Sequence, residues 1–295
     1  MLETHHHWLP VIMAIYLPLS FIITYSMAVA YKHVEPGFPY ISDTGTIPPD
    51  SCVFGQLLNI GAVIGGFIIY IRYSHILYHF RSVPGRMGLL RLNTAAYIIG
   101  LLTVLGVSIV GNFQETNVIG VHLLGAFMGF VVGFVYFVLQ TVISYKVRDT
   151  DIPGNTPNIR KFRVLLNVID FIFLVLVGTM SLVSKSLGPG AGISKRNWKP
   201  DNYGYPEHLV ATISEWLVAF TSVTYFATFY TEFKHFRVKA PEIVYYDVSD
   251  NACTAETTGE ERRGFAQSSG PNYRTIQDLN CYGNESRPEV ETALV

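Results

Sequence analysis

The sequence predicts an all-α membrane protein, a bundle of six transmembrane helices followed by a mostly disordered C-terminal tail. Of its 295 residues, 49% are hydrophobic and 15% are charged, whereas a soluble domain carries about a quarter charged residues. The mean hydropathy of +0.31 is positive, which also indicates a chain that is apolar on average. The third observation is the presence of several long apolar runs along the chain.

Six apolar runs are long enough to cross a bilayer, which requires about 20 mostly apolar residues in a helix. They cover residues 9–31, 53–73, 92–111, 118–145, 162–184 and 209–231. A membrane-spanning barrel needs short alternating segments instead, and the sequence has none. We therefore expect residues 1–231 to form the membrane domain and residues 232–295 to form the tail.

The first run is the one with a second interpretation, because Ala28-Val-Ala30 resembles a signal-peptide cleavage site. The run is longer than a signal h-region, and no basic segment precedes it. We therefore interpret residues 9–31 as a membrane helix.

The second and fourth runs carry glycines four residues apart. Gly61 and Gly65 form one such pair, and Gly125, Gly129 and Gly133 form two more. This spacing lets helix backbones approach closely in lipid. Packing within one bundle is the expected use, and a homodimer face is the alternative, so the sequence leaves the oligomeric state open.

The basic residues predict the orientation. Of the 21 Lys and Arg, 16 fall on the side that holds both termini and the second and fourth loops. The positive-inside rule therefore predicts that both termini are cytoplasmic. The first and last loops, near residues 32–52 and 185–208, are then lumenal or extracellular.

Polar side chains in a membrane domain are costly and mark candidate sites. Eight of them are expected to gather at the lumenal ends of the helices and in the first loop: Ser42, Asp43, Asn59, Asn112, Gln114, His122, His208 and Glu215. Interhelical hydrogen bonds and loop anchoring are the leading interpretation. A pocket for a lipid headgroup or small solute is the second, and catalysis or zinc binding by the His and carboxylate side chains is the third.

No catalytic or cofactor motif supports chemistry at this cluster. The sequence contains no HExxH metal pattern, GxSxG elbow, Walker loop or dinucleotide fingerprint. We therefore expect a non-enzymatic protein without a bound metal or cofactor. The net charge of −1 argues against a nucleic-acid partner.

The tail is rich in Glu, Thr, Ser, Asn and Gly, a composition typical of disorder. It contains tyrosines followed by an apolar residue three positions later, notably Tyr273 and Ile276. Such segments bind in extended form to trafficking adaptors. We interpret this pair as a candidate sorting motif.

Several segments in register resemble the DRAM family of DNA-damage-regulated autophagy modulators. The resemblance extends over about residues 9 to 240 and rests on Pro39-Tyr-Ile-Ser-Asp-Thr-Gly-Thr46, Gly111-Asn-Phe-Gln-Glu115, Gln140-Thr-Val-Ile-Ser-Tyr-Lys146, Trp198-Lys-Pro200, Tyr205, His208 and Glu215-Trp216. The histidines at the N-terminus and the long tail depart from the family pattern. Any sorting role of the tail is therefore inferred from its own residues.

The resemblance implies a six-helix protein of the lysosomal or late endosomal membrane that regulates autophagy. Members of the wider family act at the plasma membrane in phosphoinositide kinase recruitment or in lipid remodelling of GPI anchors. The DRAM branch brings no catalytic residues, so none is carried over. Two alternatives therefore remain: a lipid-binding or lipid-remodelling protein that uses the lumenal cluster, and a plasma-membrane regulator of phosphoinositide signalling. Membrane lipid and trafficking adaptors are the expected partners.

Overall fold

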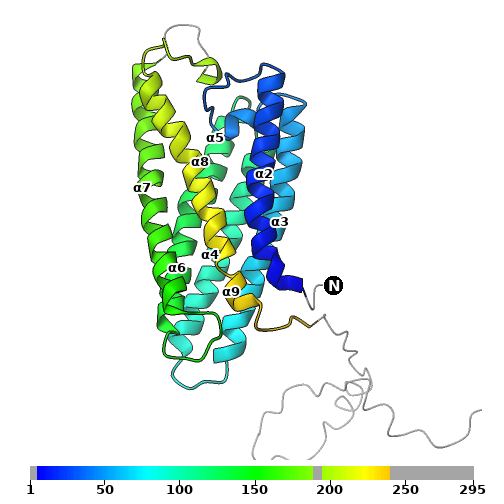
Figure 1. Cartoon of the computed structure of the whole chain (residues 1–295), viewed down its shortest axis with the longest axis vertical. Coiled ribbons are helices and arrows are strands. Elements are labelled where there is room, and N and C mark those ends of the chain that lie inside the picture. Colours follow the sequence, from blue (N-terminus) through cyan, green and yellow to red (C-terminus); the bar gives the residue numbers. More distant parts are fainter. Residues whose placement is uncertain (1–4, 189–194, 240–295) are drawn as a thin grey trace, which may run out of the picture. The chain divides into compact units, whose positions relative to one another are not determined.

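The computed structural model describes residues 5–188 and 195–239, and within these ranges the chain forms helices and no strand (Figure 1). The helices are α2 (Leu9–Ala30), α3 (Asp50–Phe80), α4 (Met87–Asn112), α5 (Ile119–Phe127), α6 (Gly133–Lys146), α7 (Pro157–Leu187), α8 (Tyr205–Ala227) and α9 (Tyr230–Phe233). Short 3-10 turns are η1 (His6–Trp8), η2 (Ser42–Gly45) and η4 (Lys195–Asn197), and the π-helical turn η3 (Met128–Val132) joins α5 to α6.

Six helical stretches in the described part of the chain are long and apolar enough to cross a membrane, which confirms the predicted class. The helices are longer than the apolar runs. The second stretch continues to Phe80 and the fifth begins at Pro157, several residues outside the predicted bounds 53–73 and 162–184. An apolar run shows only the part of a helix that lies in the hydrocarbon core. The backbone hydrogen bonds of the helix can continue beyond this part, through the headgroup region.

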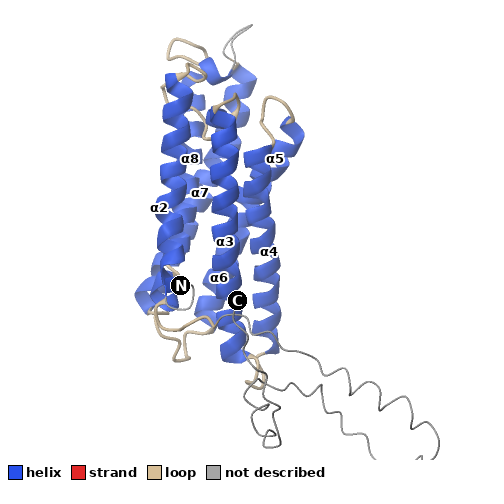
Figure 2. Cartoon of the chain, turned by 90° about the vertical axis from the view of Figure 1, so that its right-hand side faces the viewer, coloured by secondary structure: helices blue, strands red, loops and turns tan. Residues whose placement is uncertain are grey.

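The helices pack in an order that closes a ring. α2 packs against α3 and α8, α3 against α4, α4 against α6, α6 against α7, and α7 against α8. Figures 1 and 2 show these helices running side by side along one axis. α5 differs from the other helices, because it packs against α4 and makes no substantial contact with α7 or α8. The fourth span therefore has fewer contacts with α7 and α8 in its α5 half than the other spans have with their neighbours in the ring.

The glycine pairs pack helices together within the chain. A Cβ atom at Gly61 would lie 2.7 Å from Cδ2 of Leu17 on α2, and one at Gly125 would lie 2.7 Å from Cγ2 of Ile109 on α4. Real side chains do not approach this closely, so the glycines permit these contacts. Gly61 and Gly125 therefore serve the packing of helices within the bundle, as the first interpretation predicts.

The π turn η3 lies at the closest approach of the fourth span to α4. A Cβ atom at Gly106 would lie 2.4 Å from Cβ of Met128 and 2.6 Å from the backbone nitrogen of Gly129. Glycine at position 106 therefore lets α4 reach the backbone of the turn. π turns inside α-helices are rare and are often found at functional sites.

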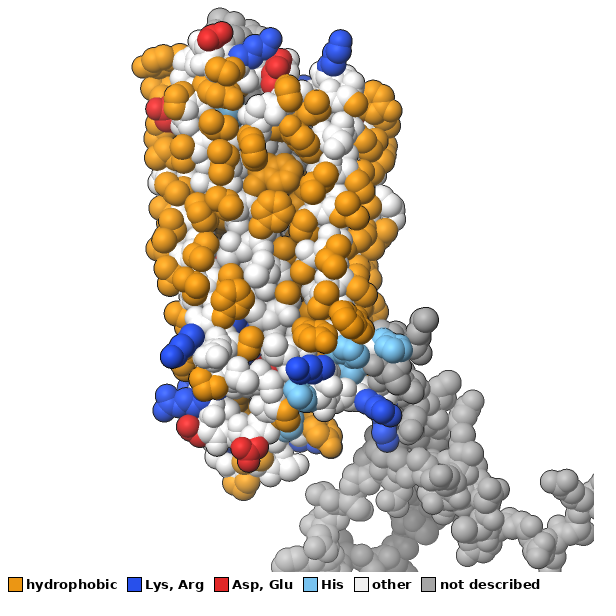
Figure 3. Space-filling model, viewed as in Figure 1, with side chains coloured by type: hydrophobic (Ala, Val, Ile, Leu, Met, Phe, Trp, Pro, Cys, Tyr) orange, Lys and Arg blue, Asp and Glu red, His pale blue; other side chains and the backbone are white. Residues whose placement is uncertain are grey.

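The outer surface of the bundle is apolar in its middle. Ile15, Val63 and Leu182 are exposed by 63%, 59% and 71% respectively. Figure 3 shows hydrophobic side chains covering the middle of one face, with charged side chains gathered toward its two ends. This is the pattern of a surface that contacts lipid.

Two loops cover one end of the bundle, the upper end in Figure 1, which we call the cap end. They are residues 32–49 and residues 195–204, and they hydrogen-bond each other. The Glu35 amide donates to the Arg196 carbonyl at 3.0 Å, and the Arg196 guanidinium donates to Oγ1 of Thr46 at 3.2 Å. At the opposite end, which we call the terminal end, α2 begins and α9 ends.

The membrane domain extends beyond its predicted boundary at residue 231. Glu232 and Phe233 are 1% and 0% exposed and belong to α9, whereas the sequence assigned them to the tail. The reason is a set of long-range ion pairs that composition does not reveal, described below. The candidate sorting motif, Tyr273 and Ile276, lies outside the described residues.

Candidate functional site

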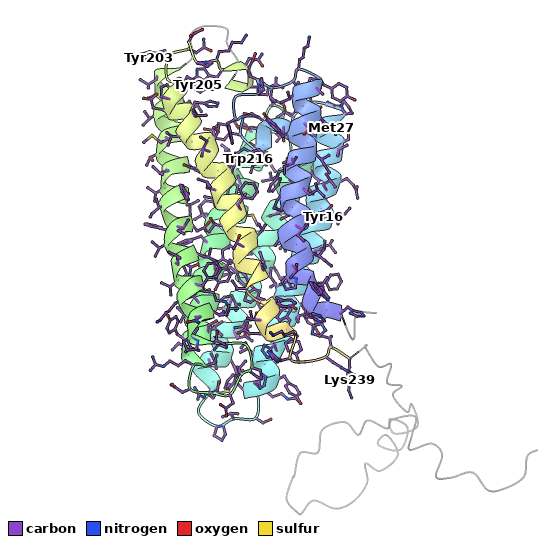
Figure 4. All side chains as sticks on the ribbon, viewed as in Figure 1. Tyr16, Met27, Tyr203, Tyr205, Trp216 and Lys239 are labelled. Atoms are coloured by element: carbon purple, nitrogen blue, oxygen red, sulfur yellow. The ribbon has the colours of Figure 1, made fainter. Side chains whose placement is uncertain are left out.

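The first cap loop is fixed to the bundle by hydrogen bonds from tyrosine and tryptophan side chains. Nε1 of Trp216 on α8 donates to the Pro39 carbonyl at 3.0 Å, and the Tyr25 hydroxyl on α2 donates to the Pro36 carbonyl at 2.8 Å. Figure 4 shows Trp216 in the cap half of the bundle, on the side of α8 that faces α2. Proline lacks an amide donor, so its carbonyl is what the loop offers at these positions.

Glu215 joins this loop to α8. Its Oε2 accepts a hydrogen bond of 2.8 Å from the backbone amide of Ile41, and the side chain is 7% exposed. The next residue, Ser42, donates weakly to Oε2 of Glu115 at 3.4 Å. A charged acceptor makes the amide bond one of the stronger kinds of hydrogen bond. Two acidic side chains, one on α8 and one in the turn between α4 and α5, thus contact the first residues of the turn η2.

Asp43 and its neighbours are enclosed beneath the loop. Asp43 and Thr44 are both 0% exposed. Oγ1 of Thr44 lies 3.1 Å from Oγ1 of Thr24 on α2, and Oγ1 of Thr46 donates to the Asp43 carbonyl at 2.9 Å. The turn is therefore part of the packed interior and is not a loop in solvent.

The two candidate histidines occupy separate environments. Nδ1 of His122 lies 2.8 Å from the Phe113 carbonyl, at the start of α5. The His208 ring, 3% exposed, packs 4.3 Å from the Trp198 ring and 5.2 Å from the Tyr40 ring, measured between ring centroids. His208 therefore fills the junction between the two cap loops and α8.

The amide side chains form a third group, between α3 and α4. Oδ1 of Asn59 accepts hydrogen bonds from Oγ of Ser108 at 2.7 Å and from Nδ2 of Asn112 at 2.9 Å. Gln114 is outside this group, and its Oε1 accepts a hydrogen bond of 3.3 Å from Asn117. The eight predicted residues thus lie at the same end of the bundle but in several separate contacts.

A cavity of about 120 Å³ lies directly under the first cap loop. Its wall is apolar and comes from five spans, with Met13, Leu58, Val107, Ala126, Phe130 and Val223 as examples. Of the predicted residues, Ser42, His122 and Glu215 line the cavity, whereas Asn59, Asn112 and His208 do not. Three polar side chains that the sequence placed near one another therefore border one mainly apolar cavity.

A cluster of buried charges at the terminal end was missed by the sequence analysis. Oε2 of Glu232 lies 2.9 Å from Nη1 of Arg72 on α3 and 3.0 Å from Nη2 of Arg163 on α7, and all three side chains are 0% exposed. The Phe229 ring lies 5.3 Å and 4.9 Å from the two guanidinium carbons, measured from its centroid.

Polar side chains complete the hydrogen bonding of this cluster. Nε of Arg72 donates to Oε1 of Gln140 at 3.0 Å, Nη1 of Arg163 donates to Oγ of Ser144 at 2.6 Å, and Nε of Arg163 donates to Oγ1 of Thr228 at 2.9 Å. The sequence analysis counted both arginines as loop charges for the orientation. The signal it did not use was their position directly beside apolar runs, where a charge needs a partner inside the bundle.

Asp170, in the middle of α7, also lies inside the bundle and is 2% exposed. Neither of its carboxyl oxygens has a hydrogen-bond partner among the described residues. Within those residues no group of three or more His, Cys, Asp or Glu side chains is arranged to hold a metal ion. We therefore take the candidate site to be the cap loop, the cavity beneath it and the polar side chains that line this cavity.

One family model matches the whole helical region of the chain. Residues 5–236 match the family model described as the Frag1/DRAM/Sfk1/Cwh43P N-terminal domain. The chain is 34% identical to rat DNA damage-regulated autophagy modulator protein 2 over 263 residues, which is 88% of this chain and 96% of the relative. No solved structure matches the chain.

Two further relatives give similar values. The chain is 35% identical over 228 residues to the human DNA damage-regulated autophagy modulator protein 2, covering 77% of this chain and 84% of the relative. It is 35% identical over 240 residues to the Xenopus laevis DNA damage-regulated autophagy modulator protein 1, covering 81% of this chain and 95% of the relative. The similarity thus extends over most of both partners in each comparison.

Proposed function

This chain belongs to the Frag1/DRAM/Sfk1/Cwh43P family, and we propose that it is a membrane-embedded, non-enzymatic modulator of autophagy. The observation that carries the proposal is the similarity of its whole helical region to proteins named autophagy modulators. The region they share contains every helix of the ring and the cap loops, so the similarity covers the entire architecture and not one isolated motif.

The proposed location is the lysosomal or late endosomal membrane, with both termini in the cytoplasm. The distribution of Lys and Arg supports this orientation, and Tyr273 with Ile276 would supply the sorting motif. The cap end then faces the lumen. The terminal end, with the loops between α3 and α4 and between α6 and α7, faces the cytoplasm and contacts the autophagy machinery.

The contacts of the cap carboxylates support a non-enzymatic role. Glu215 accepts a hydrogen bond from the Ile41 amide, a use that positions the loop. Its neighbour on the same helix, Trp216, donates to the same loop. Side chains with these partners fix one conformation of the cap, which is a structural use and needs no catalytic step.

The test is removal of the protein from cells that express it, followed by rescue with the full-length chain. We expect autophagic flux, measured as turnover of a lipidated autophagosome marker with and without an inhibitor of lysosomal acidification, to fall and then to recover. Glu215→Gln keeps an acceptor for the Ile41 amide and is expected to rescue. Flux that is unchanged by removal would overturn the proposal.

Two further outcomes test the proposed location and the proposed non-enzymatic role separately. A tagged wild-type chain is expected to coincide with a lysosomal marker, and a Tyr273→Ala chain is expected to shift to the cell surface. A wild-type chain at the plasma membrane would instead support a regulator of phosphoinositide signalling. If Glu215→Gln accumulates normally at the correct membrane but does not rescue, the carboxylate does more than accept the Ile41 amide, and the purely structural use of Glu215 is contradicted.

A further inference from the structure

The cavity under the cap loop is larger than the packing defects of a protein interior. Interiors contain few voids that exceed a water molecule, whereas this space measures about 120 Å³. Its wall is formed mainly by apolar side chains such as Leu17, Phe54 and Phe226. An apolar cavity of this size excludes water and takes up an apolar guest, as engineered cavities of about 150 Å³ bind benzene.

The ring of helices is least closely packed beside this cavity. α5 and η3 contribute Ala126, Gly129 and Phe130 to the wall, and α8 contributes Ser222. These four residues are only half-buried. Among the described residues neither α5 nor η3 packs substantially against α7 or α8, so the wall between these two groups has few helix contacts. The cavity therefore has its access from the side, at the level of the apolar outer surface.

The polar border of the cavity lies at its cap end. Ser42, His122 and Glu215 line the space there, and Phe137 and Phe226 line it toward the terminal end. A guest that enters from the side meets the ionisable side chains of His122 and Glu215 only toward the cap end, whereas deeper in the wall it meets the hydroxyl groups of Thr103 and Ser222. This arrangement matches a lipid of the leaflet nearest the cap, whose headgroup stays at the interface while its chain is surrounded by apolar groups.

From the volume, the lateral opening and the apolar wall, we infer that the cavity holds the end of one acyl chain of a membrane phospholipid, inserted between α5–η3 and α8. A lipid tail gains no hydrophobic energy by leaving one apolar medium for another. The gain is dispersion contact, because the atoms around an unfilled void lack partners on one side. The small volume selects the terminal part of a chain over a fused-ring sterol. This inference is independent of the role in autophagy.

The test uses the full-length protein in vesicles of phosphatidylcholine, a fraction of which carries a diazirine near the end of one acyl chain. After irradiation and digestion, mass spectrometry locates the labelled residues. We expect labels on Ala126, Gly129, Phe130 and Val223, which line the cavity, together with general labelling of the outer surface, including Phe127. The absence of labels from Ala126, Gly129, Phe130 and Val223 would overturn the proposal.

Filling the cavity supplies the decisive comparison. Ala126→Phe and Ala219→Phe each place a ring in the space, and labelling of the cavity residues is expected to fall about tenfold, the factor that corresponds to about 1.4 kcal/mol of lost contact. Labelling of the outer surface should not change. Ala95→Phe is the matched control, because Ala95 is exposed on α4 and does not line the cavity.

Each remaining outcome decides the proposal. Cavity labelling that survives both filling variants would place the lipid on the outer surface only, and would overturn the proposal. A photoreactive sterol at the same mole fraction that labels the cavity residues more strongly than the phospholipid would overturn the choice of an acyl chain. Monodisperse elution of each variant confirms that a lost label does not reflect misfolding.

Discussion

Glu232→Gln tests the buried charge cluster at the terminal end. The substitution keeps the shape of the side chain and removes its charge. Arg72 and Arg163 then remain as two guanidinium groups that are 0% exposed, and no other carboxylate of the described residues forms an ion pair with them. The polar partners Gln140 and Ser144 stay in place, but they supply hydrogen bonds and no compensating charge. The expected result is a large loss of stability.

The size of the loss follows from the geometry. Removing one partner of a buried ion pair costs about 3–5 kcal/mol, because the other charge is left buried and uncompensated. Glu232 contacts both arginines at 2.9 and 3.0 Å, so the upper part of this range is expected. For a domain of this size each kcal/mol lowers Tm by roughly 2–4 °C, so the full range of about 3–5 kcal/mol corresponds to a fall of about 6–20 °C in Tm.

The assay is thermal unfolding of the purified full-length protein in detergent micelles, followed by tryptophan fluorescence. Arg148→Gln is the matched control, since its ion pair with Asp149 is exposed by 60% and 81% on the two side chains and exposed pairs contribute little. A Glu232→Gln protein that melts within about 2 °C of the wild type would refute the reasoning, because that shift corresponds to about 1 kcal/mol or less.

Three further predictions address the cap, the helix contacts and the orientation. Trp216→Phe removes the hydrogen bond to the Pro39 carbonyl and is expected to lower stability by about 1 kcal/mol, measured in the same unfolding assay; an unchanged melting curve would argue against this anchor. Gly106→Val is expected to abolish monodisperse expression, whereas Gly66→Val, with no atom within 4 Å of its added Cβ, is expected to express normally; equal yields would contradict the close approach at η3. A glycosylation sequon in a flexible insert between residues 199 and 203 is expected to receive a glycan, and one between α6 and α7 is not; the reverse result would invert the proposed orientation.

The sequence was sufficient to predict the class of fold, because the length of an apolar run is a local property. Each of the six spans contains enough consecutive apolar residues to cross hydrocarbon, and no tertiary contact is needed to recognise it. The glycine pairs were informative for the same reason, since Gly61 and Gly125 lie on helix faces that spacing alone defines. Family motifs in register identified the candidate family before any contact was known.

The candidate site was predicted less completely. The sequence placed Ser42, His122 and Glu215 at one end of the bundle, and the structure brings these three to the border of one cavity. It also placed Asn59 and Asn112 in that group, whereas they bond to each other between α3 and α4. Helical periodicity gives the depth of a residue along the bundle axis, but the rotation of each helix about its own axis is decided by packing.

The sequence by itself determined the six spans and the end of the bundle at which the polar motifs gather. Tertiary structure alone decided that α5 packs on α4 and not substantially on α7 or α8, that a cavity lies under the cap loop, and that Glu232 belongs to the bundle. The physical reason is the range of the forces involved. Hydrophobic length acts within a segment, whereas Glu232 is buried by partners that lie 160 and 69 residues away in the chain.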